Sequence, residues 1–263
     1  MNREEILRKL SKSEDKLIVS KVLDRFLLSE KANKLTITDF LDPHLQSVVS
    51  KCLEAGNIDN YLFYGGYTGA ERAIVAFYPS NMPATEEPEL AGLFKVLKIS
   101  LMHRENINHR DYLGSLMGLG IKREKVGDIL VKDEYCLVIV HNDIADFIRY
   151  NLDKVGNVKV QVDFQDIESL SAYEPKIKDI RTTVASLRLD SVASAGFGMS
   201  RSKVADFIKA EKVNLNWETI PSITKMVKEG DIISIRGKGR VVLQEVGKTT
   251  KKDRISVCLK KFI

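Results

Sequence analysis

The stretch that decides the fold is RLDSVASAGFGMSRSKVADFIKAEKVNLNW, residues 188–217. Apolar residues at helical spacing, among them Leu189 and Val192, predict a helix over 184–195. A Gly-Phe-Gly segment interrupts that pattern. Ser200 follows, and it is a good helix N-cap because its hydroxyl accepts a hydrogen bond from a first-turn backbone N–H. The stretch therefore predicts two short helices in succession.

The second predicted helix carries an apolar stripe beside a basic one. Val204, Phe207 and Ile208 form the apolar stripe. Arg201, Lys209 and Lys212 recur at i, i+8 and i+11, which places three cations on a neighbouring stripe. We therefore expect this helix to pack on a core while it presents positive charge to solvent.

Strand-like segments follow the two helices. They are Val213–Asn216, Ile232–Ile235, Val241–Leu243 and Ile255–Leu259, with a turn at Glu229-Gly230-Asp231. The run Arg236-Gly237-Lys238-Gly239-Arg240 joins two of them and predicts a basic hairpin tip. Two helices and a hairpin sheet, both basic, together predict a phosphate-binding surface.

Charge is unevenly distributed along the chain. Residues 181–263 hold 17 basic and 8 acidic groups, a net charge of +9, whereas residues 1–180 hold 24 and 28, a net charge of −4. Clustered Lys and Arg gain affinity for polyanions by releasing phosphate counterions, although charge alone does not separate RNA from DNA or an acidic membrane. The expected RNA contacts are Arg188, Ser200, Arg201, Ser202, Lys203, Lys209, Lys212, Asn216, Arg236, Lys238 and Arg240.

A family resemblance rests on the order and spacing of these motifs. Arg188-Leu189-Asp190, Ser200–Val204, Lys212–Asn216 and Lys228–Ile233 resemble the S4 RNA-binding domain. Two positions depart from that pattern. Glu211 replaces the usual small residue before the Lys-Val strand, and Asn216-Trp217 replaces the usual Asn-Gly turn. Because tryptophan does not readily adopt glycine's positive φ, we expect this turn to differ.

Three further motifs lie outside that segment. Phe40-Leu41-Asp42-Pro43, Gly65-Gly66-Tyr67 with Ala70-Glu71-Arg72, and Lys125-Val126-Gly127-Asp128-Ile129 resemble the bacterial YlmH proteins, which carry an S4 domain. The resemblance implies an α+β chain with a mainly helical part at 1–68, a central RRM-like α/β sandwich at 69–170 and an S4 domain with a C-terminal strand at 178–263. It also implies work in the cytoplasm on the large ribosomal subunit, holding tRNA during quality control of stalled chains.

Upstream of residue 181 the patterns agree with that organisation. Helical spacings predict helices within residues 1–60, with a break at 38–43 and a second helix over Gln46–Leu53. Strand patterns occur at Arg72–Phe77, Phe94–Leu101, Asp128–Val131, Cys136–Val140 and Val158–Asp163, and helical patterns at Asn108–Met117 and Ile144–Leu152. Residues 79–88 and 171–178 read as an exposed loop and a linker. Phe77, Tyr78, Phe94 and Tyr135 are scattered, so we do not expect the central sheet to stack RNA bases through them.

Several function classes find no support in the sequence. Apolar runs are strand-length, well short of the roughly 20 residues that cross a bilayer, and the N-terminus shows no secretory signal. Three dispersed cysteines form no disulfide framework or CxxC pair, and four dispersed histidines form no metal-ligand array. We therefore expect a cytoplasmic protein without metal, cofactor or catalytic residues.

Three alternatives stay open. Arg188-Leu189-Asp190 with Ser194 resembles the catalytic motif of pseudouridine synthases, but only 73 residues follow Asp190, too few for the rest of such a domain. The acidic residues 1–170 could bind a protein while the C-terminal part holds structured ribosomal RNA or tRNA. A second basic set could add RNA contacts; it comprises Lys98, Arg104, Arg110, Lys122, Arg123 and Lys125.

Overall fold

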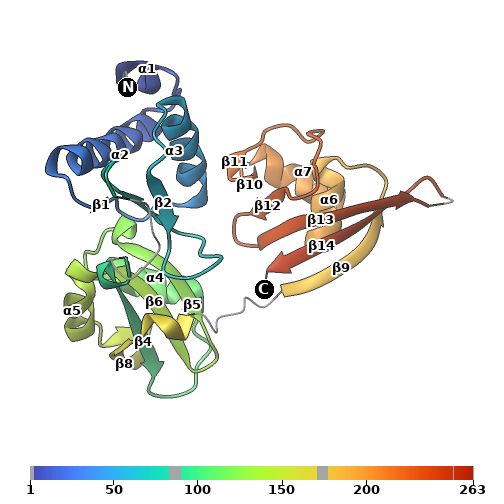
Figure 1. Cartoon of the computed structure of the whole chain (residues 1–263). Coiled ribbons are helices and arrows are strands. Elements are labelled where there is room, and N and C mark those ends of the chain that lie inside the picture. The colour runs from blue at the N-terminus through green and yellow to red at the C-terminus, as the bar shows by residue number, and fades with distance from the viewer. Residues whose placement is uncertain (1–2, 83–89, 171–176, 251, 263) are drawn as a thin grey trace. The chain divides into compact units, whose positions relative to one another are not determined.

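The computed structural model describes residues 3–82, 90–170, 177–250 and 252–262. The chain forms two compact units, residues 1–173 and 174–263 (Figure 1). Each combines helices with antiparallel sheets, so the α+β prediction is confirmed. Most of the expected loop at 79–88 and of the expected linker at 171–178 lies outside the described residues.

The first unit begins with helices on a small sheet. Helices α1 (Arg3–Arg8), α2 (Ser13–Ala32) and α3 (Pro43–Ala55) pack against a sheet of order β1 (Thr36–Ile37), β3 (Ile74–Phe77), β2 (Tyr61–Tyr64). Helix α3 begins where the sequence predicts a break. The Asp42 carboxylate accepts a hydrogen bond from Leu45 N at 2.9 Å, and Pro43 occupies the first turn, where no N–H is needed.

Strand β3 does not belong to the central sheet, so that part of the sequence prediction is wrong. It pairs with β1 and β2 instead. Val75 and Phe77 pack toward the helices, while Ile74 and Ala76 pack toward the central domain. A strand buried on both faces has no polar alternation, so its pattern does not reveal which sheet it joins.

The central sheet has the order β5 (Val126–Val131), β6 (Tyr135–His141), β4 (Phe94–Leu101), β8 (Val158–Gln165), β7 (Lys154–Val155). With α4 (His109–Gly118) and α5 (Asn142–Asn151) the main elements follow a β-α-β-β-α-β order, as in ferredoxin-like folds. Leu97 and Val138 face the core under α4 and α5, whereas Val96 and Ile139 face the N-terminal part. Short 3-10 turns lie at Ala91–Leu93, Arg123–Lys125 and Ile167–Leu170.

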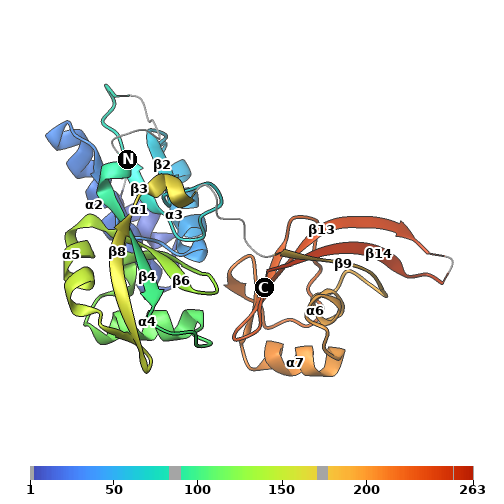
Figure 2. The same cartoon turned by 90° about the horizontal axis from the view of Figure 1, so that it is seen from below.

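The second unit is a six-stranded antiparallel sheet. Its order is β11 (Glu218–Thr219), β10 (Val213–Leu215), β12 (Ile232–Ile235), β13 (Gly239–Thr249), β14 (Ile255–Phe262), β9 (Ile177–Val184). Helices α6 (Leu189–Phe197) and α7 (Arg201–Lys209) lie on one face of it (Figure 2). The core between sheet and helices includes Val192, Val204 and Ile208.

The first helix of this unit starts later than the sequence indicates. Residues up to Val184 form β9, whose β-branched Thr182, Thr183 and Val184 pair with β14, and α6 begins only at Leu189. Gly196 does not break the helix either. A Cβ at this position would lie 2.8 Å from a methyl group of Val241, so glycine here permits close helix–sheet packing. The helix ends at Gly198, which has a left-handed φ of 65°.

Candidate RNA interface

The N-terminal end of α7 is built as the sequence predicts. Ser200 caps the helix, and its hydroxyl accepts a hydrogen bond from Lys203 N at 3.3 Å. The Ser202 hydroxyl lies 3.0 Å from that of Ser200. The side chains of Lys203 and Arg201 are exposed beside these hydroxyls. Hydroxyls, unpaired first-turn N–H groups and cations at one helix end suit an anionic oxygen ligand.

Two of the predicted RNA-binding arginines share one carboxylate. Arg201 Nε donates to Asp190 Oδ2 at 2.9 Å, and Arg188 Nε donates to Asp190 Oδ1 at 3.1 Å. The Asp190 side chain is only 6% exposed, whereas that of Arg201 is 48% exposed. The carboxylate therefore holds both guanidinium groups in place, and it leaves one net positive charge and part of Arg201 open to solvent.

A second group of cations gathers where α7 ends. Lys209 is the last residue of the helix, and Arg236 N donates to the Lys212 carbonyl at 2.9 Å, which joins the helix end to the β12–β13 hairpin. Lys212 and Arg236 line a shallow hollow of about 430 Å³ together with Asn214. Lys238 is exposed at the hairpin tip. We call Lys209, Lys212, Arg236 and Lys238 the hairpin-side cations.

The β10–β11 turn contains the residue that departs from the resembled pattern. Asn216 and Trp217 both have positive φ, 49° and 69°, so the expectation of a different turn is wrong. The Asn216 side chain holds the turn, because it donates to Asp231 at 2.7 Å and accepts from Ile232 N at 2.9 Å. Arg240 lies 5.9 Å from the Trp217 ring. These contacts stabilise a left-handed conformation that tryptophan alone would disfavour.

The eleven predicted contact residues therefore fall into three places on one unit. Five lie at the start of α6 and α7, four are the hairpin-side cations, and Asn216 and Arg240 lie around the Trp217 turn. The nine residues of α7 separate the first two groups by about 12 Å. Two basic groups at this spacing suit contacts to separate phosphates of a folded nucleic acid rather than to one small anion.

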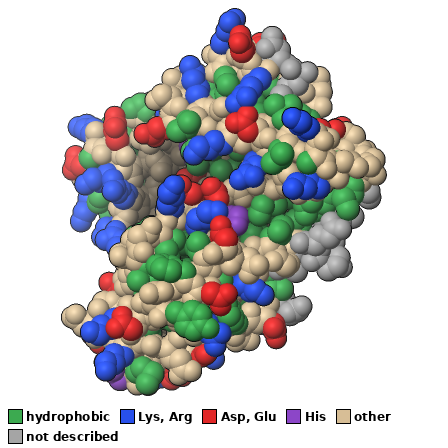
Figure 3. All heavy atoms as spheres, turned by 90° about the vertical axis from the view of Figure 1, so that its left-hand side faces the viewer, with side chains coloured by type: hydrophobic (Ala, Val, Ile, Leu, Met, Phe, Trp, Pro, Cys, Tyr) green, Lys and Arg blue, Asp and Glu red, His purple; other side chains and the backbone are tan. Residues whose placement is uncertain are grey.

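The face of the chain shown in Figure 3 has a different composition. Acidic and basic side chains are mixed there, and exposed hydrophobic side chains lie between them. Two residues of the second basic set, Lys125 and Arg104, are paired with carboxylates. Lys125 pairs with Asp39 at 3.1 Å and with Asp143 at 3.0 Å, and Arg104 pairs with Glu134 at 3.6 Å.

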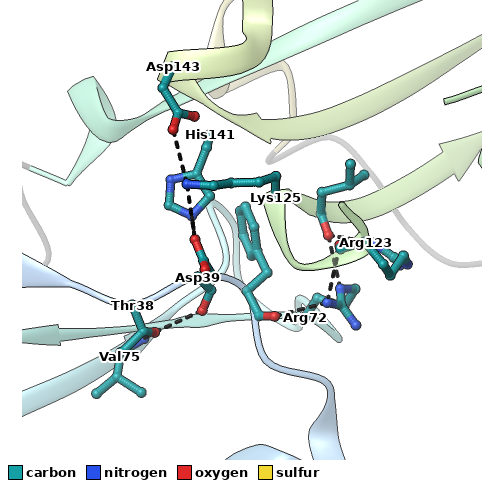
Figure 4. A network of polar contacts seen from close by, with 10 residues as sticks. Thr38, Asp39, Arg72, Val75, Arg123, Lys125, His141 and Asp143 are labelled. Carbon is teal, nitrogen blue, oxygen red and sulfur yellow. Dashed lines mark hydrogen bonds and ion pairs between the residues drawn. The ribbon is translucent and has the colours of Figure 1, made fainter. Parts of the chain in front are cut away.

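Arg123 and Arg72 belong to a polar network that sequence reasoning missed (Figure 4). Arg72 donates to the carbonyls of Phe40 at 2.9 Å and Val126 at 3.0 Å, and Arg123 donates to those of Val126 and Gly127. Burial, and secondarily the neighbouring Arg72 guanidinium, lowers the pKa of Arg123 to about 10. The network joins the N-terminal part to the central domain.

Asp128 completes this junction. Its carboxylate accepts from Tyr67 Oη at 2.8 Å, Glu71 N at 2.7 Å and Arg72 N at 2.9 Å. All three motifs that carried the family resemblance outside the C-terminal segment thus meet at one place. Their shared role in the structure is to hold two layers together, with Arg72 in a loop bonded to Asp128 in β5.

Several aromatic and titratable side chains of the first unit are buried. Phe77, Tyr78 and Phe94 are at most 2% exposed, so they offer no ring to a nucleic acid base. His141 is buried next to Lys125, and burial is the main cause that lowers its pKa. Among the described residues, no group of three His, Cys, Asp or Glu side chains is placed to hold a metal ion, and no helix is long and apolar enough to span a membrane.

Both units contain a segment that matches a known protein family. Residues 94–169 match the family described as "Putative RNA-binding domain in YlmH", and residues 178–263 match "Mitochondrial transcription rescue factor 1, C-terminal domain". The class of the central domain is therefore that of an RNA-binding domain family. Over 248 residues the chain is 31% identical to ribosome-associated protein quality control protein P2 of Bacillus subtilis (strain 168), covering 92% of this chain and 93% of that protein.

A solved structure agrees on the fold. Cell division protein ylmH from Streptococcus pneumoniae superposes with a TM-score of 0.50 at 18% identity, over 62% of this chain and 98% of that one. The chain belongs to the YlmH family, as its sequence motifs predict.

Proposed function

We propose that the chain binds structured RNA without catalysis, and that residues 178–263 form an S4-type module that makes the main contacts. The observation that carries this proposal is the group of hairpin-side cations. All four are exposed, and within the described part of the chain none of them forms an ion pair. Unpaired lysine and arginine side chains around a hollow suit phosphate oxygens, which they bind with release of counterions.

The comparisons support a ribosomal setting for this binding. The Bacillus relative is named for ribosome-associated protein quality control, and the family model of the central domain is named for RNA binding. We propose accordingly that the RNA is ribosomal RNA, tRNA or both, and that the chain acts in the cytoplasm on the large ribosomal subunit during quality control of stalled translation. A protein partner for residues 1–170 is compatible with this role.

The surroundings of Asp190 favour binding over RNA modification. A catalytic aspartate must face its substrate, whereas this carboxylate is 6% exposed and accepts hydrogen bonds from two guanidinium groups. We propose that it is a structural acid. Incubation with ribosomal RNA or tRNA should yield no new pseudouridine, and pseudouridine that disappears in Asp190→Ala would overturn this part of the proposal.

The test compares two variants of the full chain. Lys209→Ala/Lys212→Ala/Arg236→Ala/Lys238→Ala removes the hairpin-side cations. Lys248→Ala/Lys252→Ala removes exposed cations near the other end of β13, about 35 Å away for a strand of 11 residues. Filter binding to tRNA and to ribosomal RNA fragments should show a loss of at least tenfold in the first variant and little change in the second. Equal affinities in both variants and the parent chain would contradict RNA binding by the hairpin-side cations. The remaining alternative would be that the chain acts by binding a protein.

A further inference from the structure

Exposed aromatic side chains gather on the central domain, which belongs to the first unit. Phe147 and Tyr150 on α5 are 47% and 77% exposed, and Phe164 on β8 is 39% exposed. In Figure 3, hydrophobic side chains show in the lower half, where α5 faces the viewer. Of the other rings in this domain, Tyr112 and Phe94 are buried and Tyr135 is half-buried. Single exposed rings are common on proteins, but a group of three next to one another calls for an explanation.

Cations lie between these rings. The Arg149 guanidinium is 5.0 Å from the centre of the Phe164 ring and 5.7 Å from that of Tyr150, and Lys95 Nζ lies 6.0 Å from the Phe164 ring. The order Lys95, Phe164, Arg149, Tyr150 thus alternates charge and ring across three adjacent elements. We call these four residues with Phe147 the aromatic–basic patch.

We propose that the aromatic–basic patch binds a single-stranded segment of RNA, with bases stacked on the rings of Tyr150 and Phe164 and phosphates close to Arg149 and Lys95. Aromatic rings stack on any base, and interleaved cations track the backbone, which is the composition of sequence-tolerant single-strand sites. The inference rests on the proposed RNA-binding function. It adds a second site, which binds single-stranded rather than structured RNA.

Two observations favour RNA over a protein as the occupant. The five patch residues all lie within residues 94–169, the segment that matches the RNA-binding domain family. The five patch residues include two cations; on the same helix Asp143 is paired with Lys125 at 3.0 Å, and Asp146 is exposed one turn before Tyr150. Phe94, an aromatic residue of this domain that the sequence singles out, is buried, so the exposed rings are those on α5 and on β8.

The experiment uses the full chain and a ten-nucleotide single-stranded RNA with one central 2-aminopurine. Stacking on a ring should quench the 2-aminopurine fluorescence on binding, and a perfectly paired duplex of the same length should compete poorly. Tyr150→Ala/Phe164→Ala should weaken single-strand binding by about ten- to a hundredfold and abolish the quenching. Tyr150→Leu/Phe164→Leu keeps apolar bulk without rings and should lose the quenching as well.

Controls separate this inference from the proposed function. Met102→Ala removes another exposed hydrophobic side chain of the same domain, 63% exposed, and should leave binding unchanged. The variant that lacks the hairpin-side cations should keep the 2-aminopurine quenching while it loses affinity for structured RNA. Folding of each variant is checked by its melting temperature.

Unchanged quenching in the alanine variant, or full binding by the leucine variant, would overturn the patch assignment even if structured RNA still binds. A patch variant that keeps RNA binding but loses a copurifying protein would show that the patch binds a protein instead. If removing the hairpin-side cations leaves the affinity for structured RNA unchanged while the patch variants behave as expected, the proposed function is overturned instead.

Discussion

Arg201 performs two tasks that its sequence position does not separate. It follows the N-cap Ser200, where an anion is favoured, and its guanidinium binds the buried carboxylate of Asp190. The ion pair fixes the side chain, so less entropy is lost when the exposed half of the guanidinium meets a phosphate. The same pair makes Arg201 part of the unit's stability, since its loss leaves Asp190 with Arg188 alone.

Substitutions on either side of this pair should separate the two tasks. Arg201→Ala should weaken RNA binding by about 1–3 kcal/mol and also lower stability by about 1–3 kcal/mol. Asp190→Asn breaks the same pair but keeps both arginines, so stability should fall while RNA affinity of the folded protein stays close to that of the parent chain. Melting temperature and filter-binding affinity are measured on both variants.

The RNA role of Arg201 is contradicted if the melting temperature falls equally in both variants and the RNA affinity falls in neither. That result would leave Arg201 as a structural partner of Asp190 only.

Residue-level prediction from the sequence succeeds where the physics is local. The Ser200 cap depends on residues three positions apart, so the sequence contains the whole interaction. Asn216 is predicted as an RNA contact, yet both polar ends of its side chain bind Asp231 and Ile232, 15 and 16 residues away. Such a pairing across two strands is not readable from one segment.

At the scale of elements, the packing of α6 on β13 depends on one missing side chain. Gly196 is buried, and a Cβ there would lie 2.8 and 3.1 Å from the two methyl groups of Val241, which is itself fully buried. Sequence reasoning treats a glycine inside a helical pattern as a break, because the sheet residue opposite it is unknown. The helix continues because contact with the sheet outweighs the helix propensity that glycine costs.

We therefore expect that the effect of Gly196→Ala on stability changes sign with the residue at position 241. Gly196→Ala alone should lower the free energy of unfolding by about 1 kcal/mol, since overpacking outweighs the gain in helix propensity. In a Val241→Ala background the methyl groups are gone, and Gly196→Ala should be neutral or stabilising. Urea unfolding of the four proteins in this cycle measures the coupling. Additive effects would show that the two residues do not compete for the same space.

Some strands are predicted from their own residues, and others depend on distant partners. β4 and β12 have the bounds that their own apolar patterns indicate, because each is flanked by clear turns. β9 was not predicted, and its residues were assigned in part to a linker and in part to a helix. Only its pairing with β14, from Val184 with Ile255 to Ile177 with Phe262, defines it as a strand.

At the scale of the whole molecule, the junction at Asp128 holds the first unit together, whereas the single tryptophan, Trp217, belongs to the second unit. Asp128→Ala removes three hydrogen bonds to a buried carboxylate, and two backbone N–H groups lose their acceptor. We expect the first unit to lose about 2–4 kcal/mol of stability. Exposed Asp153→Ala is the matched control and should have little effect.

Two signals report the result separately. The far-UV circular dichroism transition should shift to lower temperature, while the transition seen by tryptophan fluorescence should stay in place. Equal shifts of both transitions would mean that the two units unfold as one, contrary to the separation inferred from the fold.

The measurement that tests the central claim most directly is the salt dependence of RNA binding by the full chain and by the variant without the hairpin-side cations. Contacts to about five phosphates predict that affinity of the parent chain falls by about two to three orders of magnitude between 50 and 200 mM salt. The plot of log affinity against log salt should become less steep by about 3.5 in the variant, nearly one unit for each of the four cations lost. A flat dependence in the parent chain, or the same slope in both proteins, would contradict RNA binding by this surface.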